Sequence, residues 1–138
     1  MTYQISKKLT FEAAHRLVKN YTGKCTNNHG HSWEVILYIE AQELDDRDMV
    51  IDFAETKALK NWIDDNLDHT SILWEQDPMC DYIRQSSQRL FVTKKSPTSE
   101  HIAEIIAEKA RELFDSQRAR VCCIEISETC TSSVKLFV

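Results

Sequence analysis

The sequence predicts a single α+β domain in which two helices pack on one face of a four-stranded antiparallel sheet. The chain has 138 residues, which is enough for one hydrophobic core. Segments with alternating apolar and polar residues lie near both ends, and two segments with helical periodicity lie between them. We therefore expect one domain over residues 1–138, in the order strand, strand, helix, helix, strand, strand.

Residues 2–15 and 31–43 are the first two predicted strands, because their apolar side chains alternate with polar ones. These apolar positions are Tyr3, Ile5, Leu9, Phe11 and Ala13 in the first strand, and Trp33, Val35, Leu37 and Ile39 in the second. His15 shares the apolar parity of the first strand, and His29 and His31 share that of the second. If the strands pair antiparallel, all three imidazoles lie on one face.

Two helices are predicted in the middle of the chain, over residues 53–67 and 97–115, where apolar residues recur at helical spacing. The second has Pro97 at its first position and an acid in its first turn, as helix starts often do. Residues 68–97 are less regular, and a short apolar run at 90–92 predicts a minor strand or an irregular connection.

The predicted closing strands are residues 120–128 and 133–138. In the first of them, Cys122, Ile124 and Ile126 share a parity with Glu128. A carboxylate on an apolar parity is unusual, because burying a charge without a partner is costly. This placement marks Glu128 as a candidate functional residue.

The composition excludes several classes of protein. A net charge of −5 argues against a nucleic-acid or membrane-surface partner, both of which favour a basic surface. No segment approaches the roughly 20 apolar residues that a membrane-spanning helix needs, and the N-terminal residues lack the apolar core of a secretory signal. We expect a cytoplasmic protein in which most of the five cysteines are reduced, since an odd number argues against a disulfide framework.

The triplet His29-Gly30-His31 is a candidate metal site. In an extended chain the two imidazoles face the same side, and His15 on the neighbouring strand supplies a third. Zinc held by three neutral imidazoles keeps a fourth position open for water or substrate, which is the catalytic arrangement. Two alternatives remain open from the pattern alone. In the first, the three histidines are hydrogen-bonded core residues and bind no metal. In the second, Cys25, His29 and His31 belong to a structural zinc site, which would need a fourth ligand and would leave no open position.

Three further residues carry reactive groups. Cys25 lies in a polar loop, four residues before His29, where positive potential would favour its thiolate. Asp68 precedes His69, and a carboxylate can fix the tautomer of an imidazole and raise its basicity. Adjacent residues need not interact, so this dipeptide is alternatively a surface feature at the end of a helix.

Taken together, the motifs resemble those of the 6-carboxytetrahydropterin and 6-pyruvoyltetrahydropterin synthase family. The matching segments run in the family's order and span nearly the whole chain. They are TFEAAHRL at 10–17, CTNNHGHSWEV at 25–35, MVIDFAETK at 49–57, LDH at 67–69, PTSEHIAE at 97–104 and SETCTS at 127–132. Each segment is a weak signal alone, whereas their joint occurrence is specific.

The resemblance implies a T-fold, whose subunits associate into a barrel with active sites at subunit interfaces, and hence a homo-oligomer. It also implies a role for each matching residue. His15, His29 and His31 correspond to the ligands of Zn²⁺, Cys25 to the catalytic thiol, Asp68 and His69 to its partners, Glu128 to the carboxylate that anchors the pterin ring, and Thr98 and Glu100 to a segment near the pterin pocket.

The implied substrate is 7,8-dihydroneopterin triphosphate. The short spacing in CTNNHGH resembles that of the bacterial enzymes that form 6-carboxy-5,6,7,8-tetrahydropterin. That reaction releases acetaldehyde and triphosphate, and its product feeds the 7-deazaguanine route to queuosine. A triphosphate lyase of the pyruvoyl type and a non-catalytic zinc- or pterin-binding module are the alternatives. The segment 74–96 is longer than in compact members of the family, and its role does not follow from the resemblance.

Overall fold

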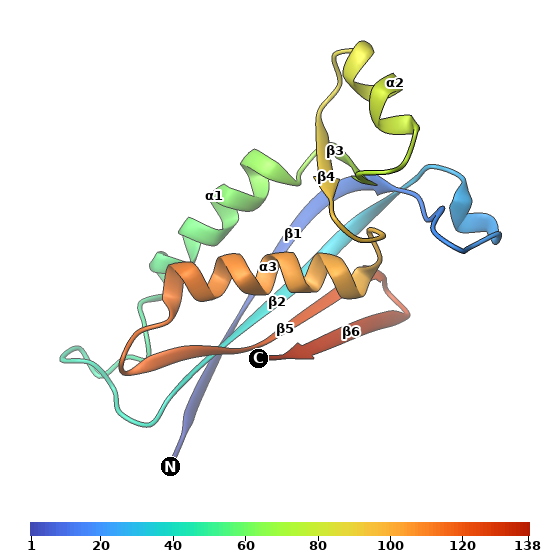
Figure 1. The fold of residues 1–138 in the computed structure, drawn as a ribbon. Coiled ribbons are helices and arrows are strands. Elements are labelled where there is room, and N and C mark those ends of the chain that lie inside the picture. The colour runs from blue at the N-terminus through green and yellow to red at the C-terminus, as the bar shows by residue number, and fades with distance from the viewer.

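A computed structural model describes residues 1–138, which form one curved six-stranded sheet with helices against one face (Figure 1). The strand order is β4-β3-β1-β2-β5-β6. Four strands form a continuous antiparallel sheet, as the sequence predicts: β1 (Tyr3–His15), β2 (His29–Ala41), β5 (Ala119–Thr129) and β6 (Ser132–Phe137). The predicted α+β class is therefore confirmed.

The sheet has two strands more than the four predicted, both from residues 68–97, and one of them is the minor strand that the apolar run 90–92 predicted as one of two possibilities. β3 (Thr70–Trp74) pairs in parallel with the last three residues of β1, and β4 (Leu90–Thr93) pairs in parallel with β3. The first four residues of β3 are all buried, so this strand shows no alternation between apolar and polar residues. Periodicity alone cannot distinguish such a short run from a buried piece of helix, so the sequence did not identify this strand.

The helices also differ in part from the prediction. Residues Phe53–Thr56 form a 3₁₀ turn, and α1 begins only after it and spans Lys57–Asn66. Asp52 and Glu55 form a capping box at the start of this turn. The second predicted helix is α3 (Ser99–Phe114), while α2 (Met79–Gln85) is a short third helix within the long segment, which the sequence did not predict.

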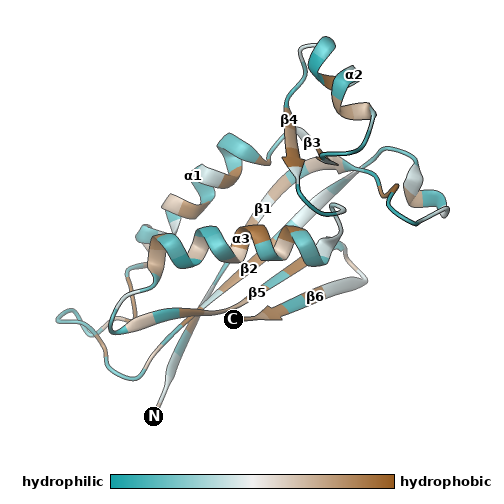
Figure 2. Ribbon diagram, viewed as in Figure 1, coloured by the Kyte–Doolittle hydropathy of each residue, from teal (hydrophilic) through white to brown (hydrophobic).

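The main core lies between the sheet and the two longer helices, which cover the same face (Figure 1). Hydropathy mapped on the ribbon shows apolar and polar residues interleaved along α3, as expected for a helix with one buried side (Figure 2). The innermost side chains come from both layers and include Trp33, Leu37, Ile39, Leu59, Ile63, Ile102 and Ile106. No helix is both long and apolar enough to cross a membrane.

A bulge in β5 corrects the predicted parity at one position. The pairing of β2 with β5 shifts between Tyr38 and Ile39, where Tyr38 is opposite Cys123 and Ile39 is opposite Val121. Cys122 is the extra residue, so it lies off the buried face and is only half-buried, while Cys123 is buried. The predicted shared parity of Cys122 with Ile124 is wrong for this reason.

Candidate active site at the ends of strands β1 and β2

Strand register brings the three predicted histidines together. His15 is directly opposite His29 in the antiparallel pair, and His31 is opposite Ala13. The ring centroids of the three imidazoles lie 4.7, 4.8 and 5.1 Å apart. The geometry therefore agrees with the strand parity of the sequence, which places all three rings on one face.

Backbone carbonyls fix the orientation of two of these rings. Nδ1 of His15 lies 2.7 Å from the carbonyl oxygen of Pro97, and Nδ1 of His29 lies 2.6 Å from that of Asn27. A carbonyl oxygen only accepts hydrogen bonds, so each Nδ1 carries the proton and each Nε2 keeps its lone pair. This is the arrangement of a metal-binding imidazole, whose other nitrogen donates to a carbonyl or carboxylate.

The Nε2 atoms face one another around a site that also contains Glu128. One donor atom from each of the three histidines and from Glu128 lies within 4.8 Å of the others. Nε2 of His15 and Nε2 of His31 are buried without a hydrogen-bond partner. Glu128 Oε2 is close to both, at 3.5 and 3.0 Å, but not in hydrogen-bonding geometry. An imidazole nitrogen lone pair and a carboxylate oxygen that face each other are both acceptors and cannot bond directly. A cation between them would satisfy both.

Burial also keeps two of these histidines in the form that binds metals. It lowers the pKa of His15 and that of His31, although the nearby Glu128 carboxylate opposes the shift. Both imidazoles are therefore neutral over a wider range of pH than a free histidine is. The unpaired nitrogens, their convergence and their neutral state fit a divalent metal ion.

Glu128 is oriented by a residue that the sequence analysis missed. Ser99, the buried first residue of α3, donates its hydroxyl hydrogen bond to Glu128 Oε1 over 2.6 Å. Of its two neighbours in the motif, Thr98 caps α3 by accepting from the amide of His101, and Glu100 is exposed. The contacts of Thr98 and Glu100 do not test their predicted role in substrate binding, which stays a prediction.

Asp68 and His69 form the predicted carboxylate–imidazole pair. His69 Nδ1 lies 2.8 Å from Asp68 Oδ2, and the other oxygen of Asp68 accepts from the amide of Glu12 over 2.8 Å. Burial raises the pKa of Asp68, but the hydrogen bonds from Glu12 and His69 outweigh it, so the pKa lies below its usual value. His69 has a φ of 55°, a strained region for a residue other than glycine, and its side chain is 74% exposed.

A cavity connects this pair to the histidine cluster. It has a volume of about 350 Å³, and both His31 and His69 line it, together with Glu12, Ala13, Ala14, Gly30, Ser32 and Thr70. Cys25 does not line this cavity and lies in a 3₁₀ turn, Lys24–Thr26, of the loop between β1 and β2. Neither Asp68 nor His69 makes a hydrogen bond to Cys25 within one chain, so their grouping as catalytic partners stays a prediction.

Cys25 has contacts of its own in that loop. Its carbonyl oxygen accepts a hydrogen bond from the amide of Leu17 over 2.8 Å, and its side chain is partly exposed. Hydrogen bonding to Cys25 is the main cause of a raised pKa at the Tyr21 phenol. The backbone of Cys25 is therefore tied to Leu17 at the other end of the loop, and its side chain contacts Tyr21.

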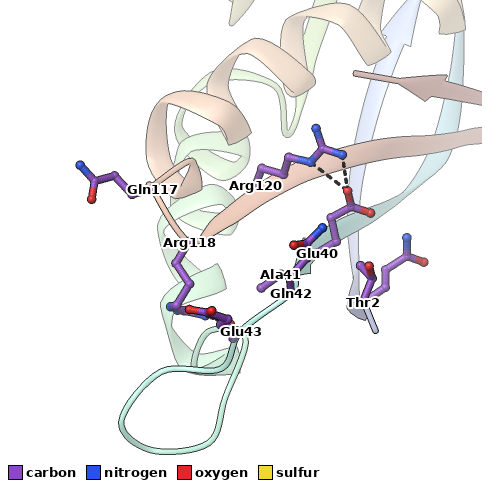
Figure 3. Close-up of a pocket in the computed structure, with 9 residues that line it drawn as sticks. Thr2, Glu40, Ala41, Gln42, Glu43, Gln117, Arg118 and Arg120 are labelled. Atoms are coloured by element: carbon purple, nitrogen blue, oxygen red, sulfur yellow. Dashed lines mark hydrogen bonds and ion pairs between the residues drawn. The ribbon is translucent and has the colours of Figure 1, made fainter.

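A larger pocket lies elsewhere and contains none of the predicted site residues. It has a volume of about 1060 Å³ and is formed where β2 ends and β5 begins (Figure 3). Its two arginines are already engaged: Arg120 bonds Glu40, and Arg118 donates to backbone carbonyls of Glu43, Met49 and Val50. The histidine cluster is the better candidate for chemistry, because its donor atoms are unpaired.

Comparison with known families agrees with this site. Residues 4–137 match the sequence model of the family described as 6-pyruvoyl tetrahydropterin synthase. The chain belongs to this family. It is 34% identical to the 6-carboxy-5,6,7,8-tetrahydropterin synthase of Rickettsia bellii, over 90% of this chain and 92% of the relative. It is also 34% identical to the Synechocystis enzyme of the same name, over 96% and 92% of the two chains.

Solved structures of similar shape confirm the T-fold that the sequence motifs imply. An uncharacterized protein of Wolinella succinogenes superposes with a TM-score of 0.86 at 26% identity, over 99% of this chain and 98% of that one. The 6-pyruvoyl tetrahydropterin synthase of Caenorhabditis elegans superposes with a TM-score of 0.75 at 21% identity, over 100% and 96%. At 21% identity, the similarity to the Caenorhabditis elegans protein shows a shared fold and no more.

Proposed function

We propose that this protein is a 6-carboxy-5,6,7,8-tetrahydropterin synthase, which converts 7,8-dihydroneopterin triphosphate to 6-carboxytetrahydropterin, acetaldehyde and triphosphate for queuosine biosynthesis in the cytoplasm. The names of its curated relatives support this activity. The observation that carries it is the set of convergent, unpaired imidazole nitrogens beside a cavity that His69, hydrogen-bonded to Asp68, also lines. A protein that only binds zinc or a pterin would not need a histidine paired with a carboxylate beside the metal site.

The metal in this proposal is Zn²⁺, held by His15, His29 and His31. When bound, the ion supplies Lewis acidity toward the side-chain oxygens of the substrate and lowers the cost of removing a proton from an adjacent carbon. The donor set suits zinc, since neutral imidazoles are among its usual ligands. Glu128 Oε2 also lies 3.5 and 3.0 Å from Nε2 of His15 and His31. We nevertheless assign Glu128 to the substrate, because three imidazoles alone leave zinc the open position that catalysis needs.

The residues of the chain supply the remaining chemistry. Glu128 accepts paired hydrogen bonds from the 2-amino-pyrimidinone edge of the pterin, and Thr98 and Glu100 line the same pocket. His69 moves protons through its free Nε2, because Asp68 binds the other nitrogen and holds the ring in place. Cys25, as a thiolate, is the second group that moves a proton.

The proposal includes a homo-oligomer with active sites at subunit interfaces. Only the last three residues of β1 pair with β3, so most of β1 has an unpaired edge, and β6 is an edge strand as well. Unpaired edges favour pairing with another chain. A neighbouring copy would also supply the thiol that the cavity of His69 lacks within one chain.

The second candidate is a lyase that forms 6-pyruvoyltetrahydropterin. It is favoured by the description of the matching family. The two candidates share the zinc site and differ in whether a carbon–carbon bond is cleaved.

Product analysis tests both. Purified protein with measured zinc content is incubated with 7,8-dihydroneopterin triphosphate, and the pterin product and acetaldehyde are quantified. Acetaldehyde and 6-carboxytetrahydropterin in equal amounts support the proposal. Triphosphate release without acetaldehyde would favour the pyruvoyl reaction, and substrate binding without turnover would favour the module.

A further inference from the structure

The long segment 74–96, together with Pro97 directly after it, contacts the end of β1 and the residue that follows it. Asp77, just before α2, pairs with Arg16. The carbonyl oxygen of Pro97 accepts a hydrogen bond from Nδ1 of His15. Figure 1 shows α2 and the loop that joins β1 to β2 at the same end of the sheet. Lys19 in that loop also lies over the Trp74 ring, 5.6 Å from its centroid.

The strongest of these contacts is the ion pair of Arg16 with Asp77. Arg16 Nε donates to Asp77 Oδ2 over 2.8 Å, and Nη2 donates to Oδ1. The Asp77 side chain is 0% exposed and Arg16 is 24% exposed. Asp77 Oδ1 also accepts from the amide of Met79 at the start of α2. Bidentate pairs of this kind fix geometry as well as charge.

Arg16 is the residue through which the segment reaches both halves of the site. It directly follows His15, whose ring is oriented by Pro97. It directly precedes Leu17, whose amide donates to the carbonyl oxygen of Cys25 over 2.8 Å. A displacement of the Arg16 backbone would therefore move an imidazole on one side and the loop with the thiol on the other.

We propose that Arg16 and Asp77 are positioning residues, which hold His15 and the loop of Cys25 in a fixed relation by anchoring both to the segment 74–96. This inference rests on the proposed function, in which Cys25 is the reacting thiol. A gain in stability is a weaker explanation, because a buried ion pair often contributes no more than well-packed apolar side chains do. Rates of reaction, by contrast, are sensitive to displacements of about 1 Å.

The test compares Asp77→Asn, Arg16→Gln and the double variant with the wild type. The double variant is included because it leaves no buried charge without a partner, so we expect it to fold even if a single variant does not. The matched control is Asp81→Asn, which breaks an exposed ion pair with Arg84 in the same helix. Zinc content, the rate of iodoacetamide labelling of Cys25 located by peptide mass spectrometry, and kcat and KM are measured.

We expect the folded variants to keep their zinc, to label several times faster at Cys25, and to lose about tenfold to a hundredfold in kcat with a smaller change in KM. The control should match the wild type. Wild-type labelling and kcat in the folded double variant would overturn the inference. Faster labelling together with an active Cys25→Ala variant would leave the positioning role standing and refute the catalytic role of the thiol.

Discussion

Ser99→Ala tests whether the start of α3 holds Glu128 ready for the substrate. The change removes one hydroxyl and the 2.6 Å hydrogen bond to Glu128 Oε1, and it leaves the three histidines untouched. Glu128 would then adopt other rotamers, and fixing it again on binding would cost free energy. Substrate affinity should fall, while zinc content should not change.

The size of the effect follows from the contact and its exposure. A hydrogen bond to a charged group contributes about 1.5–3 kcal/mol when it is buried. The Glu128 side chain is 31% exposed, so water replaces part of the loss. We therefore expect about 1 kcal/mol, equivalent to about fivefold weaker binding. Glu128→Gln should cost more, because it removes the charge that the pterin edge binds.

The assay is equilibrium binding of 7,8-dihydroneopterin together with the kinetics of the triphosphate substrate. The expected result is a raised dissociation constant and KM with a nearly unchanged kcat. Ser6→Ala, an exposed position on β1, is the control and should behave as the wild type. Unchanged affinity in a folded Ser99→Ala protein would refute the idea that this hydroxyl orients Glu128.

Three further changes test other parts of the account. His29→Ala should lose most of its zinc and its activity, as measured by elemental analysis and turnover, and full zinc content would exclude this residue as a ligand. Cys25→Ala should bind zinc and pterin normally but lose about 10²–10⁴-fold in kcat, and near-normal turnover would exclude the thiol from proton transfer. Burial raises the pKa of Asp77, but hydrogen bonds from Arg16 and Met79 lower it below its usual value. Its stabilising contribution is complete above pH about 4 and is lost as the pH falls through the lowered pKa. Urea unfolding should therefore show a steeper acid loss of stability in the wild type than in the double variant Arg16→Gln/Asp77→Asn, and equal slopes would contradict this.

The sequence predicted the parts of the structure that have a clear period. Long alternation in β1 and β2 was enough to place His15, His29 and His31 on one face, since side-chain direction in a strand depends only on parity. The helices with recurring apolar residues were also predicted, with ends that differ by a few residues. Short elements such as β3 and α2 lack a full period and were missed.

Other features depend on contacts between distant residues, which no local pattern reveals. The pair of Arg16 with Asp77 joins residues 61 positions apart, and the bond of Ser99 to Glu128 joins residues 29 positions apart. The bulge at Cys122 depends on how β5 fits against β2. The one local signal was the position of Glu128 on the apolar parity of β5. A carboxylate there indicates a partner for its charge, but the sequence alone does not identify that partner.

The most direct test of the central claim is a crystal structure of the zinc-loaded protein with anomalous diffraction measured at the zinc edge. The account predicts one strong anomalous peak per chain, bonded to Nε2 of His15, His29 and His31, with at least one position open to water or substrate. A peak elsewhere, or an ion enclosed entirely by protein atoms, would contradict it.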